Sequence, residues 1–218
     1  IYIMYVGPDI VTDGLVLGLD AGSTRSYPGT GTTWYDLSET GANWTLPAAS
    51  VFNSGTMNYT SNASSLAPPT AWQSATDLTI EIWYKPITVG TGCCETVFGR
   101  YDFRFFQIGV SLYTMISFTD ASGNRYYQHP AYSVSYSEWH HVVGMRRNNR
   151  FIIWIDGVEK HNTNFGTGLP LYDVGGTWSM SSGGHSNIDI TSNRIYNRGL
   201  SDSEIIQNFN AQKNRFGL

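Results

Sequence analysis

The chain has 218 residues, of which 14% are charged, and its net charge at pH 7 is −4. With three lysines (Lys85, Lys160 and Lys213), it lacks the basic patch that nucleic acid or an anionic membrane surface requires. No apolar run approaches the roughly 20 residues of a membrane-spanning helix, so we expect no membrane insertion.

The first six residues form a short apolar segment. This segment is too short for a signal peptide and lacks a basic start. We interpret it as an edge strand or as an arm that docks on another subunit. It comprises Ile1, Tyr2, Ile3, Met4, Tyr5 and Val6. We therefore separate residues 1–13 from a single domain that spans residues 14–218.

The next strands alternate with glycine-rich and proline-containing loops. Residues 14–20 predict the first strand, and residues 23–43 predict a long irregular loop. Short strands are expected near residues 44–46, 51–53 and 57–59. The clearest period of two lies in residues 77–86, where Leu78, Ile80, Ile82 and Tyr84 share one face. Thr79, Glu81, Trp83 and Lys85 share the opposite face.

A loop at residues 90–94 contains two adjacent cysteines, Cys93 and Cys94. They are either a reduced pair or a strained vicinal disulfide, and neither would staple the fold. Strands are then predicted at residues 96–100, 103–110, 112–119 and 125–129. The next three, at 138–146, 150–155 and 158–161, form a meander. Its second connection, Asp156-Gly157, suits a type I′ turn. Both alternating sets of side chains in the first two strands of the meander are largely apolar. This predicts a central position in the sheet, with one face in the core and the other lining a region only partly exposed to water.

Short strands at residues 172–174 and 178–180 and a last strand at residues 185–196 precede one helix, expected at residues 201–214. Ser201 is a good N-cap, and Glu204 three residues later completes a capping box. Ile205, Ile206 and Phe209 provide an apolar stripe. The sequence thus predicts an all-β, two-sheet antiparallel sandwich with a short C-terminal helix.

Three segments carry a resemblance to a known family. DLTIEIWYKP, EWHHVVGMRRNNRFIIWIDGVEK and NIDITSNRIYNRGLSDSEIIQNF are similar to the "FTIEAWVKP" strand, the "WHHVV…LYVDG" meander and the "RIYNRALSDEEI" strand and helix of laminin-G-like domains of type 3. The resemblance covers roughly Gly14 to Leu218. It implies a concanavalin-A-like jelly roll.

A second resemblance concerns the opening, GPDIVTDGLVLGLDAGSTRSYPGTGTTWYDLS. It is similar to the start of LamG-type virion proteins of tailed bacteriophages. This resemblance implies a location on the virion surface, as a capsid decoration, head fibre or tail fibre protein. The implied partners are other virion proteins, copies of this chain and a host-surface polysaccharide. A secreted, extracellular bacterial lectin-like module is the alternative.

The jelly-roll fold also hosts glycoside hydrolases, which makes hydrolysis the third functional class. Retaining hydrolases need two carboxylates about 5–5.5 Å apart, which enzymes of this fold place on one strand. No strand here has that spacing, and Glu81 is the sole carboxylate on its face of residues 77–86. We therefore expect no enzymatic activity and assign no catalytic residue.

The resemblance also suggests two sites. Asp20 and Asp189 could lie together and hold one structural calcium ion, although each could equally cap a strand end. Trp83, Glu81, His140 and Trp154 are glycan-binding candidates on the concave sheet face. The loops at 23–43 or 163–170 could equally cover them. We expect His141, on the opposite face from His140, to be an interior residue.

Overall fold

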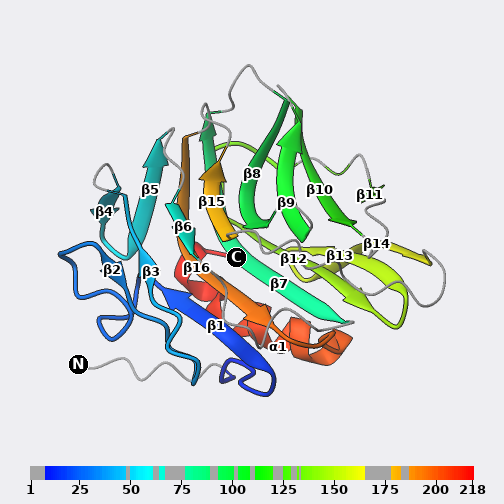
Figure 1. Cartoon of the computed structure of the whole chain (residues 1–218), viewed down its shortest axis with the longest axis horizontal. Helices are drawn as coiled ribbons and strands as arrows, with labels where there is room; N and C mark the ends of the chain where they lie inside the picture. Colours follow the sequence, from blue (N-terminus) through cyan, green and yellow to red (C-terminus); the bar gives the residue numbers. More distant parts are fainter. Residues whose placement is uncertain are drawn as a thin grey trace.

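The computed structural model contains two antiparallel sheets and a C-terminal helix, which confirms the predicted fold class (Figure 1). Its described residues are 8–47, 50–60, 64–66, 77–88, 93–100, 103–108, 111–119, 125–128, 132, 134–164, 178–182 and 187–218. The predicted arm, Ile1–Val6, lies outside them, as does the short strand predicted at residues 172–174. Within the described part, no helix is long and apolar enough to cross a membrane.

The larger sheet is organised around β16, which forms hydrogen bonds with three other strands. In spatial order the sheet contains β14 (Val158–Asn164), β13 (Arg150–Ile155), β12 (His140–Arg147), β7 (Leu78–Thr88), β16 (Asn187–Tyr196), β5 (Thr56–Thr60) and β4 (Val51–Asn53). The first part of β16 pairs with β5, and its second part pairs with β1 (Leu15–Asp20).

The smaller sheet faces the larger one in the sandwich. Its spatial order is β11 (Arg125–Gln128), β10 (Ser111–Thr119), β9 (Phe103–Ile108), β8 (Cys93–Arg100), β15 (Trp178–Ser182) and β6 (Ser64–Leu66). Cys93 and Cys94 therefore begin a strand, where a loop had been predicted. The expected loop at residues 23–43 contains β2 (Thr33–Trp34), which pairs with β3 (Trp44–Thr45).

The core between the sheets follows from the period of two in β7. Leu78, Ile80, Ile82 and Tyr84 are buried in one cluster with Val97 and Phe98 of β8 and with the inward side chains of β12, β13 and β16. This face assignment is confirmed. The opposite face of β7, which carries Thr79, Glu81 and Trp83, is buried as well.

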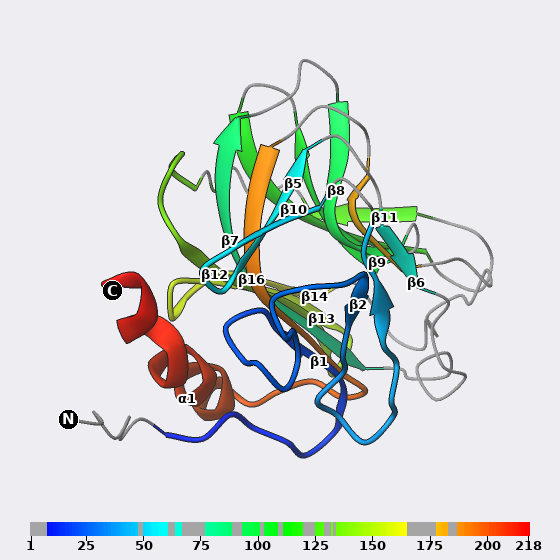
Figure 2. The same cartoon turned by 90° about the vertical axis from the view of Figure 1, so that its left-hand side faces the viewer.

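The C-terminal helix covers that opposite face. Figure 2 shows α1 (Asp202–Gln212) on the outer side of the larger sheet, followed by a 3₁₀ turn, η2 (Lys213–Phe216). The helix begins where the capping box predicted, because Ser201 accepts a hydrogen bond from the Glu204 amide while the Glu204 carboxylate accepts one from the Ser201 amide. Ile205 is fully buried against the sheet.

The hairpin turns are fixed by local sequence. Asp156 (φ 51°) and Gly157 (φ 75°) both have the positive φ of a type I′ turn, as predicted. Asn148 (φ 50°) and Asn149 (φ 59°) do the same between β12 and β13. These two turns set the register of the meander that positions the site described below.

Candidate functional site

Glu81 lies at the centre of a buried polar network beneath α1. Its carboxylate is 2.6 Å from Arg194 Nη1, accepts a hydrogen bond from Asn208 Nδ2 at 2.7 Å, and lies 3.2 Å from His141 Nε2. Burial alone would raise the pKa of Glu81. The Arg194 guanidinium and the hydrogen bonds from His141 and Asn208 outweigh that effect and lower the pKa to about 2. Glu81 is therefore an ionised structural residue, and the expected interior position of His141 is confirmed.

Trp83 lies beside this network and is covered by aromatic side chains from the C-terminal segment. Phe216 of η2 stacks on the Trp83 ring with 4.4 Å between centroids, and Phe209 of α1 stacks on it at 5.8 Å. Trp83 is fully buried, and Trp154 is 8% exposed within the apolar cluster under the helix. The described residues that cover Trp83 belong to α1 and η2, whereas the alternatives predicted from the sequence were an exposed face or a covering loop. Neither tryptophan presents a free face for stacking on a sugar.

His140 does not share a face with the other three predicted glycan residues. In the β7–β12 register, His140 lies opposite Tyr84, whereas His141 lies opposite Trp83. Cross-strand partners point to the same side of a sheet. His140 therefore points to the side of the core residue Tyr84, and grouping it with Trp83 and Glu81 was wrong.

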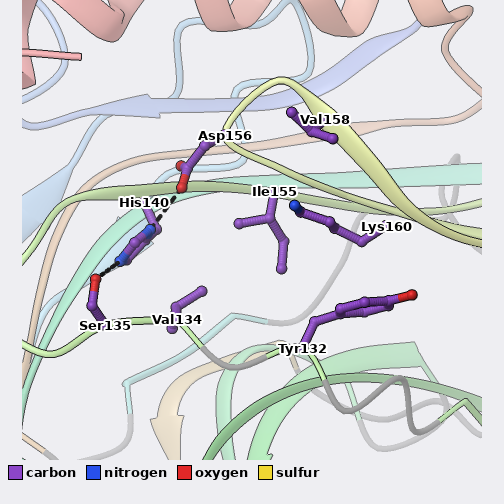
Figure 3. Close-up of a pocket in the computed structure, with 8 residues that line it drawn as sticks. All are labelled: Tyr132, Val134, Ser135, His140, Ile155, Asp156, Val158 and Lys160. Carbon is purple, nitrogen blue, oxygen red and sulfur yellow. Dashed lines mark hydrogen bonds and ion pairs between the residues drawn. The ribbon is translucent and has the colours of Figure 1, made fainter.

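His140 lines an open pocket of about 560 Å³, shown in Figure 3. The His140 ring lies between two partners: Nδ1 is 2.8 Å from Asp156 Oδ2, and Nε2 is 3.0 Å from Ser135 Oγ. The other Asp156 oxygen accepts the His141 amide at 2.8 Å. Asp156 thus orients the imidazole while it forms the hairpin turn.

The rest of the pocket combines an aromatic ring, a cation and apolar side chains. Tyr132 is 38% exposed, and Lys160 of β14 extends into the pocket from the opposite wall (Figure 3). The apolar lining consists of Val134, Ile155 and Val158. Tyr132, Ser135, Asp156 and Lys160 were not predicted as site residues. A β-bulge in β14 at Lys160 interrupts the alternation, and Lys160 lines the pocket together with Val158.

The connectivity from Ser135 through His140 to Asp156 matches that of a serine-hydrolase triad. However, Ser135 Oγ also donates a hydrogen bond to the Glu138 carboxylate, which directs its proton away from His140. A nucleophilic serine must pass that proton to the histidine. The chain of contacts therefore serves to hold the His140 ring in place.

The two predicted calcium ligands have separate cationic partners. Asp20 forms an ion pair with Arg215 at 2.8 Å, and Asp189 forms one with Lys85 at 2.9 Å. Asp20 lies opposite Ser192, three positions from Asp189 along β16. Within the described residues, no cluster of three or more histidine, cysteine or acidic side chains is arranged to hold a metal. The predicted pairing of Asp20 with Asp189 is thus replaced by two ion pairs.

Asp189 and Lys85 also line a second pocket, of about 410 Å³, beside the end of η2. Trp139 forms one wall, with Lys85 Nζ 5.3 Å from its ring centroid and Phe216 packed against it. Asn58 donates hydrogen bonds to Asp189 and Asn187 at the rim. The charges in this pocket are already paired within the protein.

The sheet order, the meander and the closing helix together agree with a family assignment. Residues 55–206 match the model of the Laminin_G_3 family, described as the Concanavalin A-like lectin/glucanases superfamily. The chain belongs to this superfamily. No curated protein sequence gave a significant match.

Solved structures with the same fold include members from bacteria and a protozoan. The binding domain of Paraclostridial Mosquitocidal Protein 1 has a TM-score of 0.73 and 15% identity, over 92% of this chain and 53% of that one. The ligand-binding domain of botulinum neurotoxin serotype D, in complex with N-acetylneuraminic acid, has a TM-score of 0.74 and 13% identity, over 93% of this chain and 52% of that one. Trypanosoma rangeli sialidase in complex with sialic acid has a TM-score of 0.68 and 15% identity, over 95% of this chain and 34% of that one.

At these identities the likeness concerns the fold alone. This superfamily member spans about half the length of the two toxin domains and a third of the sialidase. The sandwich is thus one part of each of those larger proteins.

Proposed function

We propose that this chain is a non-enzymatic surface protein of a tailed-phage virion that binds a polysaccharide on the host. Binding is assigned to the pocket that contains Tyr132, His140 and Lys160. An exposed aromatic ring beside fixed hydrogen-bonding groups is the combination that a sugar requires, because sugars present both apolar C–H faces and hydroxyl groups. This pocket is the observation that carries the proposal.

A binding role without covalent chemistry is supported by how the carboxylates are used. Glu81 is buried in an ion pair with Arg194, and Asp189 is paired with Lys85. Asp156 is held by His140 and by a backbone amide. A glycosidase needs one carboxyl group with a raised pKa to act as an acid. Among the described carboxyl groups, the pKa values of Glu81 and Glu204 are shifted downward.

The virion location rests on the resemblance of the opening segment to phage virion proteins. Residues that follow the proposed arm dock on α1: the Val11 amide donates to Asn208, and Gln207 donates to the Asp9 carbonyl. The chain therefore enters the sandwich beside the helix. We assign attachment to other virion proteins and to copies of this chain to the arm, which leaves the pocket free for the host.

A secreted, extracellular carbohydrate-binding module is the second candidate. It is favoured by two proteins that contain the same fold, because one toxin binding domain and one sialidase are described in complex with N-acetylneuraminic acid and sialic acid. The two candidates differ in location and partners, and both use the same pocket.

Co-purification separates them. Particles from a culture that produces the chain are banded on a density gradient and probed with an antibody against residues 14–218. We expect the chain in the particle band; a free monomer that is retarded on a polysaccharide column would contradict the virion proposal. Recombinant protein should bind host polysaccharide without releasing reducing sugar. The Tyr132→Ala variant should lose that binding, while Tyr35→Ala, an exposed tyrosine outside the pocket, should retain it.

A further inference from the structure

The three lysines of the chain differ in how their charge is used. Lys85 Nζ is 2.9 Å from Asp189 Oδ2, so its charge is paired. Lys213 Nζ lies 5.5 Å from the centroid of the Phe209 ring and does not line the pocket. Lys160 forms no ion pair with any residue that the structure describes, yet it is half-buried and lines the pocket.

The acidic groups nearest to Lys160 in the chain and in the pocket already accept hydrogen bonds. Both oxygens of Asp156 are engaged, one by His140 and one by the His141 amide. Glu159 accepts a hydrogen bond from Asn162. Glu159 lies opposite Trp154, on the side of the sheet that α1 covers, and it does not line the pocket. Among the residues that the structure describes, no carboxylate neutralises this ammonium group, which the protein positions in a cavity.

We infer that this pocket selects an acidic sugar, whose carboxylate binds Lys160 while the sugar ring packs on Tyr132. An ammonium group held beside apolar walls favours an anion more strongly than one in open solvent, because the local dielectric constant is lower. Val158 and Ile155 provide such walls. At the other end of the pocket both ring nitrogens of His140 are occupied, by Asp156 and Ser135, so Ser135 Oγ is the group that would accept a hydrogen bond from a sugar hydroxyl. The inference rests on the proposed glycan-binding function and specifies its ligand class.

The test compares acidic polysaccharides with neutral polymers of the same backbone. Polygalacturonate and polysialate are each used beside their carboxyl-reduced forms, and binding is measured by affinity electrophoresis and calorimetry. We expect the wild-type protein to bind at least one acidic polymer and to bind its reduced form much less. Because a hydrogen bond to a charged group is involved, Lys160→Gln should weaken binding of the acidic polymer roughly 10- to 100-fold.

The matched control is Lys213→Gln, which removes the same charge from a lysine outside the pocket and should leave binding unchanged. Raising the salt concentration should weaken binding by the wild-type protein and should have much less effect on Lys160→Gln. Equal thermal unfolding temperatures of the two variants would show that neither substitution disturbs the fold.

The remaining outcomes distinguish the inference from the function on which it rests. Equal binding of acidic and reduced polymers, with no effect of Lys160→Gln, overturns the acidic-sugar inference and leaves the glycan-binding proposal intact. If Lys160→Gln and Lys213→Gln weaken binding of the acidic polymer equally, the inference is also overturned, because the attraction then depends on the net charge of the protein and not on the position of Lys160. Binding of no polymer, acidic or neutral, contradicts both.

Discussion

The buried ion pair between Glu81 and Arg194 beneath α1 should contribute strongly to the stability of the fold. Glu81→Gln keeps the shape of the side chain but leaves the Arg194 guanidinium, whose side chain is 5% exposed, without a counter-charge. Removing one partner of a buried pair costs about 3–5 kcal/mol. The lowering of the Glu81 pKa from 4.5 to about 2 gives a similar value, on the order of 3 kcal/mol at neutral pH.

Urea unfolding at pH 7 measures this loss. A change of this size should lower the urea midpoint by about 1 M or more, because the free energy of unfolding typically falls by about 1–3 kcal/mol per molar urea. Asp202→Asn is the control, because it breaks the Arg147–Asp202 pair at 2.8 Å, in which Asp202 is 59% exposed. An exposed pair contributes about 0–1 kcal/mol. The double variant Glu81→Gln with Arg194→Met should recover part of the loss, since the unpaired charge is gone.

The pH dependence gives an independent check. The folded-state pKa of Glu81 lies below its unfolded value, so its contribution is fully present above about pH 4.5 and is lost as the pH falls toward 2. The stability difference between wild type and Glu81→Gln should therefore narrow over this range. If the variant unfolds at the wild-type urea concentration at pH 7, or if the difference stays constant down to pH 2, the ion pair does not stabilise the helix face as argued.

Two further predictions concern local structure, and both are measured by urea unfolding. Gly157→Ala should lower the free energy of unfolding by about 2 kcal/mol or more, because φ is 75° and the added Cβ would lie 2.8 Å from the Phe209 ring. Gly217 has the same φ, but a Cβ there would meet open space, so Gly217→Ala should lower it by about 1 kcal/mol. Equal losses would show that the Gly157–Phe209 contact is unimportant. Ser201→Ala should cost about 1 kcal/mol through loss of the N-cap, and an unchanged midpoint would contradict that role of the capping box.

Features set by neighbouring residues could be predicted from the sequence. The alternation in residues 77–86 identified the core face of β7, Asp156-Gly157 identified the type I′ turn, and Ser201 with Glu204 located the start of α1. Each of these signals lies within about ten residues and depends on backbone preferences. Their physical causes are local, so no knowledge of the fold was needed.

Features that depend on long-range packing could not be predicted in the same way. The face of His140 was misassigned because it depends on the register between β7 and β12, which are some 55 residues apart in the chain. The cover over Trp83 comes from Phe209 and Phe216, more than 120 residues later. One signal was available: an apolar helical stripe must bury itself against something, and the outward face of β7 carried a tryptophan.

The two sides of the meander therefore have different tasks. On the side of His141, β12 is covered by a helix, an ion pair and stacked aromatic rings, and these described residues bury Glu81 and Trp83. On the side of His140, the turn residue Asp156 orients the imidazole, and Lys160 enters the same pocket four residues later. Because one turn sets both the hairpin register and the pocket geometry, the binding groups are held by the scaffold before any ligand arrives. That arrangement would lower the entropic cost of binding, which supports the proposed role of the pocket.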